Sequence, residues 1–348
     1  MTSKIAILSE FLLQTDTQIR IFDLGRRVSK IALSDFQKFE RGEISYPFPY
    51  EQTAWVGLLY WNKKDKNQHN IWFIRMPLDE TGCIQLSARD EFMHLLLSRF
   101  QETMQKGENA KTLQHVLKDN PYVFKPTEDK MAVFHSKALQ VLQQSPTQFF
   151  TDALNYIQGD DYQQWQHLGI QGITDLAVRQ DQEEIHQALV KTLAKVPEQV
   201  FNVLCQNLEN ETIDIDLAKI IATRIQESNN EQIISNGIRA LAMCQSTQFK
   251  NDIIYSVLEK IAPDQAIVLV AIAAKTWEVL SDEKILNLFL EKLSCSNAGP
   301  ELFNSLMQDL MFMPGLREKI LLEFRNPNRS ENLSKAVGTF FQVVPVEL

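Results

Sequence analysis

The residues with the clearest potential for chemistry form a short charged cluster early in the sequence. Arg20 and Asp23 precede a single glycine, and Arg26 and Arg27 follow it. Guanidinium groups bind phosphate or carboxylate oxygens in pairs, and backbone N–H groups at a bend add further donors. We therefore predict an anion-binding site at Arg26 and Arg27. The alternative is that these arginines pair with acidic side chains of the same domain, such as Asp23 or Glu40.

A second cluster consists of aromatic residues that alternate with proline. Tyr46, Phe48 and Tyr50 are separated by Pro47 and Pro49. Proline favours an extended backbone, and extended aromatic segments insert into a partner's groove or line a groove themselves. The alternative is that the segment folds across the sheet of its own domain.

A third cluster, Tyr162, Trp165 and His167, follows two consecutive aspartates. We interpret Tyr162 and Trp165 as candidate binding residues in an aromatic patch on a helical surface. The alternative is that they belong to the core between neighbouring helices, where aromatic residues at helical spacing are common.

The sequence lacks the motifs of several enzyme classes. It contains no Gly-rich nucleotide-binding loop, no His-Glu-x-x-His zinc motif and no Gly-x-Ser-x-Gly hydrolase elbow. The six histidines are never spaced as metal ligands on one helix turn. We therefore predict no catalytic residue, no metal and no cofactor, and we do not expect an enzyme.

The charge is distributed unevenly along the chain. Residues 1–106 contain 14 basic and 13 acidic side chains, so the net charge of −9 comes from the remainder. Nucleic-acid binding depends on clustered Lys and Arg that neutralise phosphates. We therefore expect the acidic part to bind another protein rather than nucleic acid; the oligomeric state stays open.

Cysteine usage and hydropathy predict a cytoplasmic protein. Cys83, Cys205, Cys244 and Cys295 are far apart and have apolar neighbours, which is typical of buried, reduced thiols. The longest apolar run, Ala266 to Ala274, is much shorter than the ~20 residues that span a bilayer. We expect no membrane partner.

The first part of the chain has the pattern of an α+β domain with an antiparallel sheet. Alternating and β-branched runs predict strands at residues 18–24, 26–31, 53–61, 71–76 and 83–86. Ser34 and Ser87 are the expected N-caps of two helices. Gly107 to Asn109 is the expected linker, so we predict a small domain at residues 1–108.

From residue 109 to 348 the period is helical throughout, which predicts an all-α domain. Proline and glycine breaks place the starts of helix pairs near residues 147, 182, 213, 247, 282 and 314. The steps average about 33 residues, within the range of helical repeat proteins. We predict a HEAT-like stack of helix pairs, an α-solenoid; the alternative is an irregular bundle.

Two short segments carry a resemblance to a known family. Residues 8–12, Leu-Ser-Glu-Phe-Leu, and residues 22–28, Phe-Asp-Leu-Gly-Arg-Arg-Val, resemble the opening of an uncharacterised bacterial family, a domain of unknown function. The resemblance implies a bacterial cytoplasmic protein, and it carries no assigned activity or site residue.

Together these observations favour a non-enzymatic scaffold or adaptor for protein–protein interaction. Repeat stacks present long surfaces to partners, while neighbouring repeats supply the stability. The alternative is a regulator that binds an anionic ligand or nucleic acid through the region of Arg26 and Arg27.

Overall fold

The computed structural model describes residues 7–14, 16–105, 117 and 120–343. Contacts within the chain separate two compact units, residues 1–134 (unit 1) and 135–348 (unit 2). The division falls inside helix α5 (Glu128–Leu142). The linker expected at Gly107–Asn109, with the domain boundary predicted beside it, lies outside the described residues.

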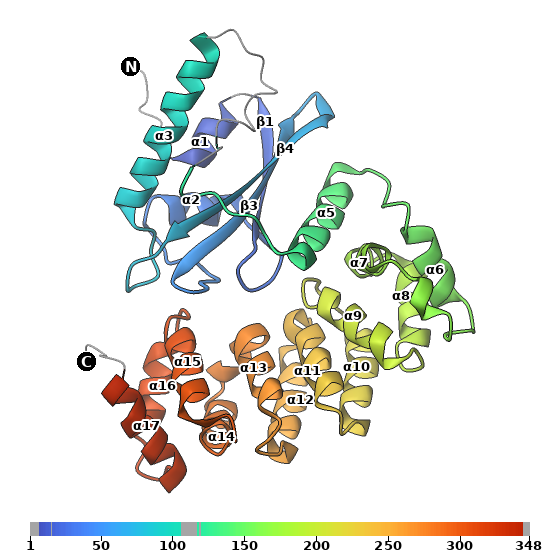
Figure 1. The fold of residues 1–348 in the computed structure, drawn as a ribbon, viewed down its shortest axis with the longest axis vertical. Helices are drawn as coiled ribbons and strands as arrows, with labels where there is room; N and C mark the ends of the chain where they lie inside the picture. The colour runs from blue at the N-terminus through green and yellow to red at the C-terminus, as the bar shows by residue number, and fades with distance from the viewer. Residues whose placement is uncertain (1–6, 15, 106–116, 118–119, 344–348) are drawn as a thin grey trace. The chain divides into compact units, whose positions relative to one another are not determined.

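Unit 1 is the predicted α+β domain, with one antiparallel sheet in the order β2-β1-β3-β4 (Figure 1). Its elements are α1 (Leu8–Leu13), β1 (Thr17–Asp23), β2 (Ser29–Ile31), α2 (Leu33–Glu40), β3 (Thr53–Asn62), β4 (Asp65–Pro77) and α3 (Leu86–Gln105). Strand β3 lies in the middle and pairs with β1 and β4 along most of its length. Alternating side chains of β1 and β3 point to opposite faces of the sheet, and both faces are buried, with Ile21 and Val56 on one face and Phe22 and Leu59 on the other.

The fifth predicted strand, at residues 83–86, is wrong. Ile84 makes only an isolated bridge with Leu78, and α3 already begins at Leu86. The reason is a tight turn, in which Asp79 Oδ1 accepts hydrogen bonds from the N–H groups of Thr81 and Cys83. The start at Leu86 also places Ser87 inside the helix rather than at its N-cap.

The N-cap predicted at Ser34 is likewise displaced. Helix α2 begins at Leu33, and its N-cap residue is Ala32, which has no capping side chain. The carbonyl of Ala32 accepts from the N–H groups of Asp35 and Phe36, so the backbone alone starts the helix. Ala32 is the one residue between β2 and α2, and its methyl side chain has no oxygen with which to cap the helix.

Unit 2 is all-α in the residues that the structure describes, as predicted (Figure 1). Its helices after α5 are α6 (Phe150–Gln158), α7 (Ile170–Val178), α8 (Glu183–Thr192), α9 (Glu198–Leu208), α10 (Ile215–Glu227), α11 (Glu231–Ala240), α12 (Thr247–Lys260), α13 (Ala266–Lys275), α14 (Glu283–Ser294), α15 (Gly299–Met311), α16 (Arg317–Phe324) and α17 (Glu331–Val343), with short 3₁₀ turns η2 (Trp165–His167), η3 (Leu241–Met243) and η4 (Trp277–Ser281). The even-numbered helices α6 to α16 begin within a few residues of the predicted pair starts.

The helices of unit 2 contact one another in an alternating pattern. Helix α7 contacts α9, α9 contacts α11, and α11 contacts α13. In the other series α6 contacts α8, α8 contacts α10, and α12 contacts α14. We call these the odd row and the even row. Helices that are two apart in sequence therefore lie side by side, which is the arrangement expected when consecutive helix pairs stack.

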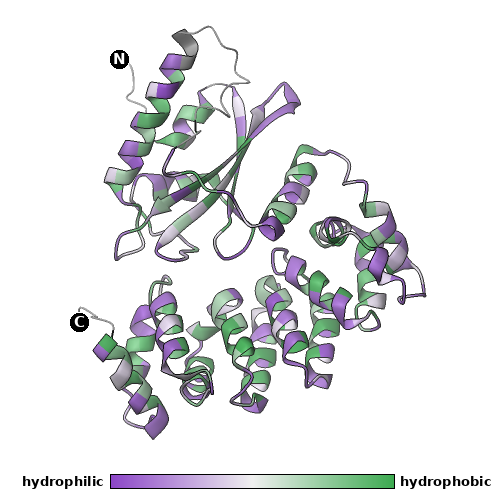
Figure 2. Cartoon of the chain, in the orientation of Figure 1, coloured by the Kyte–Doolittle hydropathy of each residue, from purple (hydrophilic) through white to green (hydrophobic). Residues whose placement is uncertain are grey.

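Two helices of the odd row are distinctly apolar. Helices α7 and α13 are the most apolar, as the green ribbon of Figure 2 shows. Among the described residues, no helix combines the length and hydropathy needed to cross a membrane.

Gly172 allows the start of α6 and helix α7 to approach closely. A Cβ atom at this position would lie 2.3 Å from the backbone oxygen of Phe149, and backbone cannot move as easily as a flexible side chain. We expect Gly172→Ala to lower the free energy of unfolding by about 3 kcal/mol, measured by urea denaturation.

Gly338 in α17 is the matched control for this substitution. Apart from its chain neighbours and the backbone of its own helix, no described atom lies within 4 Å of a Cβ placed there. Gly338→Ala should instead stabilise the chain by about 0.5–1 kcal/mol through helix propensity. Equal effects of the two substitutions would contradict the close packing at Gly172.

Candidate functional site

A buried carboxylate, Asp23, organises the charged cluster found in the sequence. Its oxygens accept hydrogen bonds from the backbone N–H groups of Gly25 (3.1 Å), Arg26 (3.1 Å) and Arg27 (3.2 Å). The hydroxyl of Tyr46 donates a fourth bond at 2.9 Å. The backbone donors of the bend after β1 are therefore already bonded to a carboxylate of the same domain, and the binding of an external anion at Arg26 and Arg27 stays a prediction.

The same contacts join two clusters that are separate in the sequence. Arg26 donates from Nε to the carbonyl of Pro49 (2.8 Å), and its guanidinium lies 6.0 Å from the centre of the Tyr50 ring. The Lys130 Nζ atom, near the start of α5, lies over the same ring at 5.7 Å from its centre, which is a cation–π distance. Residues 46–50 are thus fastened to residues 23–27, while Tyr50 stays partly exposed.

The two arginines are interior residues in this arrangement. Only 2% of Arg26 and 4% of Arg27 is exposed. An incoming phosphate would have to displace Asp23 from the backbone donors that it already uses. Arg20 lies apart from this group, and its guanidinium stacks over the Trp61 ring at 5.4 Å.

Burial dominates the electrostatics of Asp23. Loss of solvent raises the pKa of its carboxyl from 3.8 to about 6, although the hydrogen bonds from Arg27, Gly25 and Tyr46 act in the opposite direction. Burial also raises the pKa of Tyr46 well above its usual value, so this hydroxyl remains a donor to Asp23.

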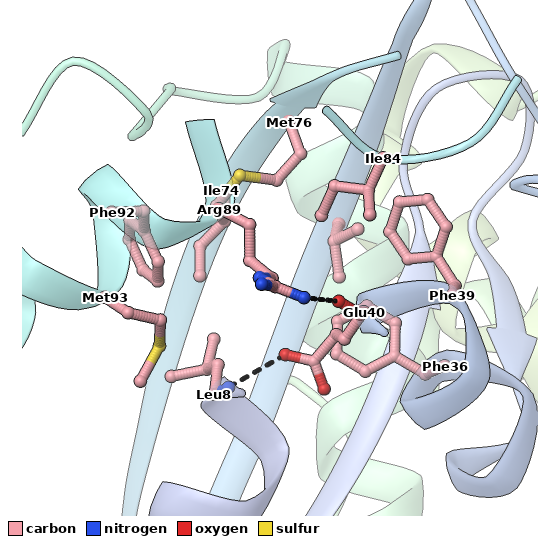
Figure 3. Close-up of a pocket in the computed structure, with 11 residues that line it drawn as sticks. Leu8, Phe36, Phe39, Glu40, Ile74, Met76, Ile84, Arg89, Phe92 and Met93 are labelled. Atoms are coloured by element: carbon pink, nitrogen blue, oxygen red, sulfur yellow. Dashed lines mark hydrogen bonds between the residues drawn. The ribbon is translucent and has the colours of Figure 1, made fainter. Parts of the chain in front are cut away.

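Helix α2 separates two cavities of unit 1, and its residues Phe36 and Phe39 line both. The inner cavity, of about 20 Å³, lies between α2, the sheet and α3. Glu40 is its one acidic lining residue, and Figure 3 shows its carboxylate directed toward the start of α1. It accepts from the N–H of Leu8 at 3.0 Å and from the hydroxyl of Ser9.

Arg89 closes the inner cavity from α3. Its guanidinium donates to the backbone oxygen of Glu40 at 2.9 Å and also pairs with the exposed Asp90. The remaining walls are apolar, so the cavity isolates Glu40 from water. This arrangement fixes α1 and α3 to the end of α2 without presenting a reactive group to solvent.

The outer cavity, of about 220 Å³, is lined by the predicted aromatic segment. Tyr46, Pro47 and Phe48 form one wall, and Ile31 and Ile44 contribute to the others. The Tyr46 ring packs against Phe39 at 5.0 Å and edge-on against Phe48 at 6.4 Å. The segment therefore lies against its own domain and also lines this pocket, and its role in binding a partner stays a prediction.

The pH dependence of stability should report the burial of Glu40. Burial raises its pKa from 4.5 to about 7, against the hydrogen bonds of Ser9 and Leu8. The folded chain then binds more protons than the unfolded chain, so the contribution of Glu40 to the free energy of unfolding falls as the pH rises from about 4.5 to 7. Between about pH 4.5 and 7, the free energy of unfolding of the unsubstituted chain should fall by about 3 kcal/mol more than that of Glu40→Gln. Urea denaturation at several pH values measures the difference.

Asp35→Asn provides the control for this titration. Asp35 lies on the exposed face of the same helix, so Asp35→Asn leaves Glu40 and its surroundings in place and should keep the decline that Glu40 causes. Asp23 and Glu211, whose pKa values burial also raises, contribute declines of the same sign in both variants. A decline in Glu40→Gln as steep as in the unsubstituted chain would contradict the assignment.

The third cluster of the sequence does not join this site, because Tyr162 and Trp165 belong to unit 2. Tyr162 follows α6 and packs edge-on against Tyr156 at 5.8 Å, and its carbonyl accepts from the Tyr156 hydroxyl. Trp165 opens the 3₁₀ turn η2, and His167 ends it. The segment is a loop with one short turn, because Gly159 ends α6 before the aromatic residues begin.

A second buried aspartate, Asp175 of α7, organises the start of the helical unit. It accepts hydrogen bonds from Ser136 Oγ (2.6 Å), Thr147 N (2.9 Å) and Thr147 Oγ1 (2.5 Å). Arg179 lies one turn away and pairs with it at 3.2 Å. Asp175 therefore fastens α5 and the loop before α6 to α7.

Two groups of residues correct or extend the sequence analysis. Cys205 and Cys244 are buried as predicted, but Cys295 is exposed because it follows the last residue of α14. Glu40 was not identified as buried, although Phe36, Phe39 and Glu40 follow helical i, i+3, i+4 spacing and so share the apolar face. Among the described residues, no group of His, Cys, Asp or Glu is arranged to hold a metal ion.

Comparison with known proteins gives one family. A family model described as a protein of unknown function, DUF3549, matches residues 3–341. This match confirms the resemblance of the opening segments to a domain of unknown function. No curated protein and no solved structure matches the chain.

Proposed function

Since the chain belongs to DUF3549, a family of proteins of unknown function, we propose a role from its own geometry: a non-enzymatic scaffold that binds other proteins along unit 2. The observation that supports it is the alternation of the odd and even rows. The odd row offers successive helices side by side from α7 to α13, and the even row does so from α6 to α10 and from α12 to α14. Such arrays give partners long surfaces without a deep pocket.

The repeat type is part of the proposal. The even-numbered helices begin at Phe150, Glu183, Ile215, Thr247, Glu283 and Arg317, and each is followed by one helix of the odd row or by α17. Two helices in about 33 residues, without a tetratricopeptide or ankyrin signature, fit a HEAT-like stack best.

The location and the alternative function are also inferred. Four cysteines without a disulfide fit a reducing compartment, so we place the protein in the bacterial cytoplasm, as the family resemblance implies. An anion-binding or nucleic-acid-binding role at Arg26 and Arg27 is less well supported, because Asp23 already holds the backbone donors.

The experiment compares surface variants of the full-length chain in native cells. Tyr255 in α12 and Leu322 in α16 are exposed apolar residues of the even row, and Ile267 in α13 is its counterpart in the odd row. Tagged chains carrying Tyr255→Arg with Leu322→Arg, or Ile267→Arg alone, would be cross-linked in cells and analysed by mass spectrometry.

We expect one protein to cross-link to unit 2 of the unsubstituted chain, and we expect that cross-link to disappear in only one of the two variants. Loss in the even-row variant assigns the contact to that row, and loss with Ile267→Arg assigns it to the odd row. Cross-links confined to unit 1, or retained at full strength in both variants, would contradict a partner surface on the helical unit.

A further inference from the structure

We propose that the outer edge of β2, together with the outer cavity beside α2, binds an extended peptide that carries an acidic residue next to a bulky apolar residue. This peptide site lies in unit 1 and does not depend on the partner surface proposed for unit 2. It combines three features: an open sheet edge, a pocket for one side chain on one face of the sheet, and an exposed lysine of the edge strand on the other face.

The first feature is the edge of the sheet. Strand β2 is terminal in the sheet order, and its register pairs Ser29 with Asp23 and Ile31 with Ile21. Leu24 donates its N–H to Trp55 of β3 at 2.7 Å, so alternation directs the backbone groups of Asp23 toward β2. Ser29 and Ile31 therefore bond to β1.

By the same alternation, the N–H and C=O of Lys30 point away from the sheet. Strand β2 is the last strand of the sheet, and no backbone group in the described part of the chain is bonded to the N–H or C=O of Lys30. The opposite edge is different, because residues 122–124 cover β4: Arg75 donates to the Tyr122 carbonyl (2.7 Å), and Phe124 donates to the Phe73 carbonyl (3.2 Å). The open edge at Lys30 can thus accept one added strand.

The second feature is the pocket. The outer cavity of about 220 Å³ begins at Ile31 and is walled by Phe36, Phe39, Ile44 and Phe48. It is smaller than the ~300–1,000 Å³ of sites for small molecules, so one large side chain is its best-fitting occupant. Tyr46 is part of the wall, and the hydrogen bond from its hydroxyl to Asp23 holds its side chain in place.

The third feature is charge, which sets the register of the peptide. In an added strand, the residue opposite Lys30 lies on the same face as Lys30, and its neighbours lie on the face of Ile31 and the pocket. A carboxylate opposite Lys30 is favoured, and an apolar side chain beside it enters the pocket. Asp35 lines the pocket and opposes an acidic side chain there. The recognised pattern is therefore an alternation of acidic and apolar residues.

The test uses the full-length chain and blocked heptapeptides in isothermal titration. TVEFEVT places two acidic residues on one face and its phenylalanine on the other. TVKFKVT reverses the charge, and TVEGEVT removes the pocket residue. We expect saturable binding of TVEFEVT, weaker binding of TVKFKVT by about fivefold and weaker binding of TVEGEVT by at least about tenfold.

Lys30→Glu supplies the decisive comparison, because Lys30 is exposed and its replacement leaves the core unchanged. It should reverse the preference, so that TVKFKVT binds more tightly than TVEFEVT. Methylation of the one peptide N–H group that faces the Lys30 carbonyl should abolish binding, whereas methylation of the N–H groups of the two neighbouring residues should not. Absence of binding, an unchanged preference in Lys30→Glu, or equal tolerance of methylation at every position would overturn the proposal.

Discussion

Asp23→Ala is expected to lower the free energy of unfolding of unit 1 by about 3 kcal/mol or more. The substitution leaves three backbone N–H groups without their acceptor, and the Tyr46 hydroxyl keeps only its longer bond to the Trp55 carbonyl at 3.3 Å. Each buried unsatisfied group costs about 1–3 kcal/mol, and the sum is offset in part because the buried carboxylate is also removed. The bend after β1 and the segment at residues 46–50 should lose their shared anchor.

Hydrogen exchange read by mass spectrometry measures this effect within unit 1. Amides of β1 and β2 should exchange about a hundredfold faster in Asp23→Ala, while those of α11 and α13 in unit 2 should not change. Tyr46→Phe removes one donor and should cost about 1 kcal/mol. If Tyr46→Phe were as destabilising as Asp23→Ala, the backbone bonds of Asp23 would contribute nothing, and its central role would be refuted.

Asp175→Ala should destabilise the start of unit 2 by a similar or larger amount. The carboxylate is fully buried and pairs with Arg179, of which 4% is exposed. Removing one partner of a buried ion pair costs about 3–5 kcal/mol, because the remaining charge has no counter-ion. Ser136 and Thr147 lose their acceptor as well.

Two variants separate the charge from the hydroxyl groups around Asp175. Ser136→Ala removes the hydrogen bond to Asp175 and the one accepted from Gln171 Nε2, but it keeps the ion pair, so it should cost about 1–2 kcal/mol. The double variant Asp175→Ala with Arg179→Leu should recover part of the loss, since no unpaired charge remains. Hydrogen exchange of the amides in α6 and α7 measures these effects. A double variant that is less stable than Asp175→Ala would argue against the ion pair as the main source of the stability that Asp175 provides.

Several features of this protein follow from the sequence by itself. The period of apolar residues determined where strands give way to helices, and the breaks at proline and glycine placed the helix-pair starts near those of α6 to α16. Both signals are local, because a strand or a helix exposes one face to the core at a fixed spacing. The antiparallel sheet was predictable for the same reason, and so was the donor-rich bend at Arg26 and Arg27.

Only the tertiary structure decided which group the bend binds and which charges are buried. Tyr46 reaches Asp23, and Arg26 reaches Pro49, across 23 residues of chain in each case. Such contacts depend on how two segments pack, and the local spacing of residues does not encode that packing. From the sequence alone, Arg26 and Arg27 therefore had the pattern of a surface site. Glu40 is buried for the same reason: α1 and α3 enclose the end of α2 and supply the N–H groups and the guanidinium that surround it.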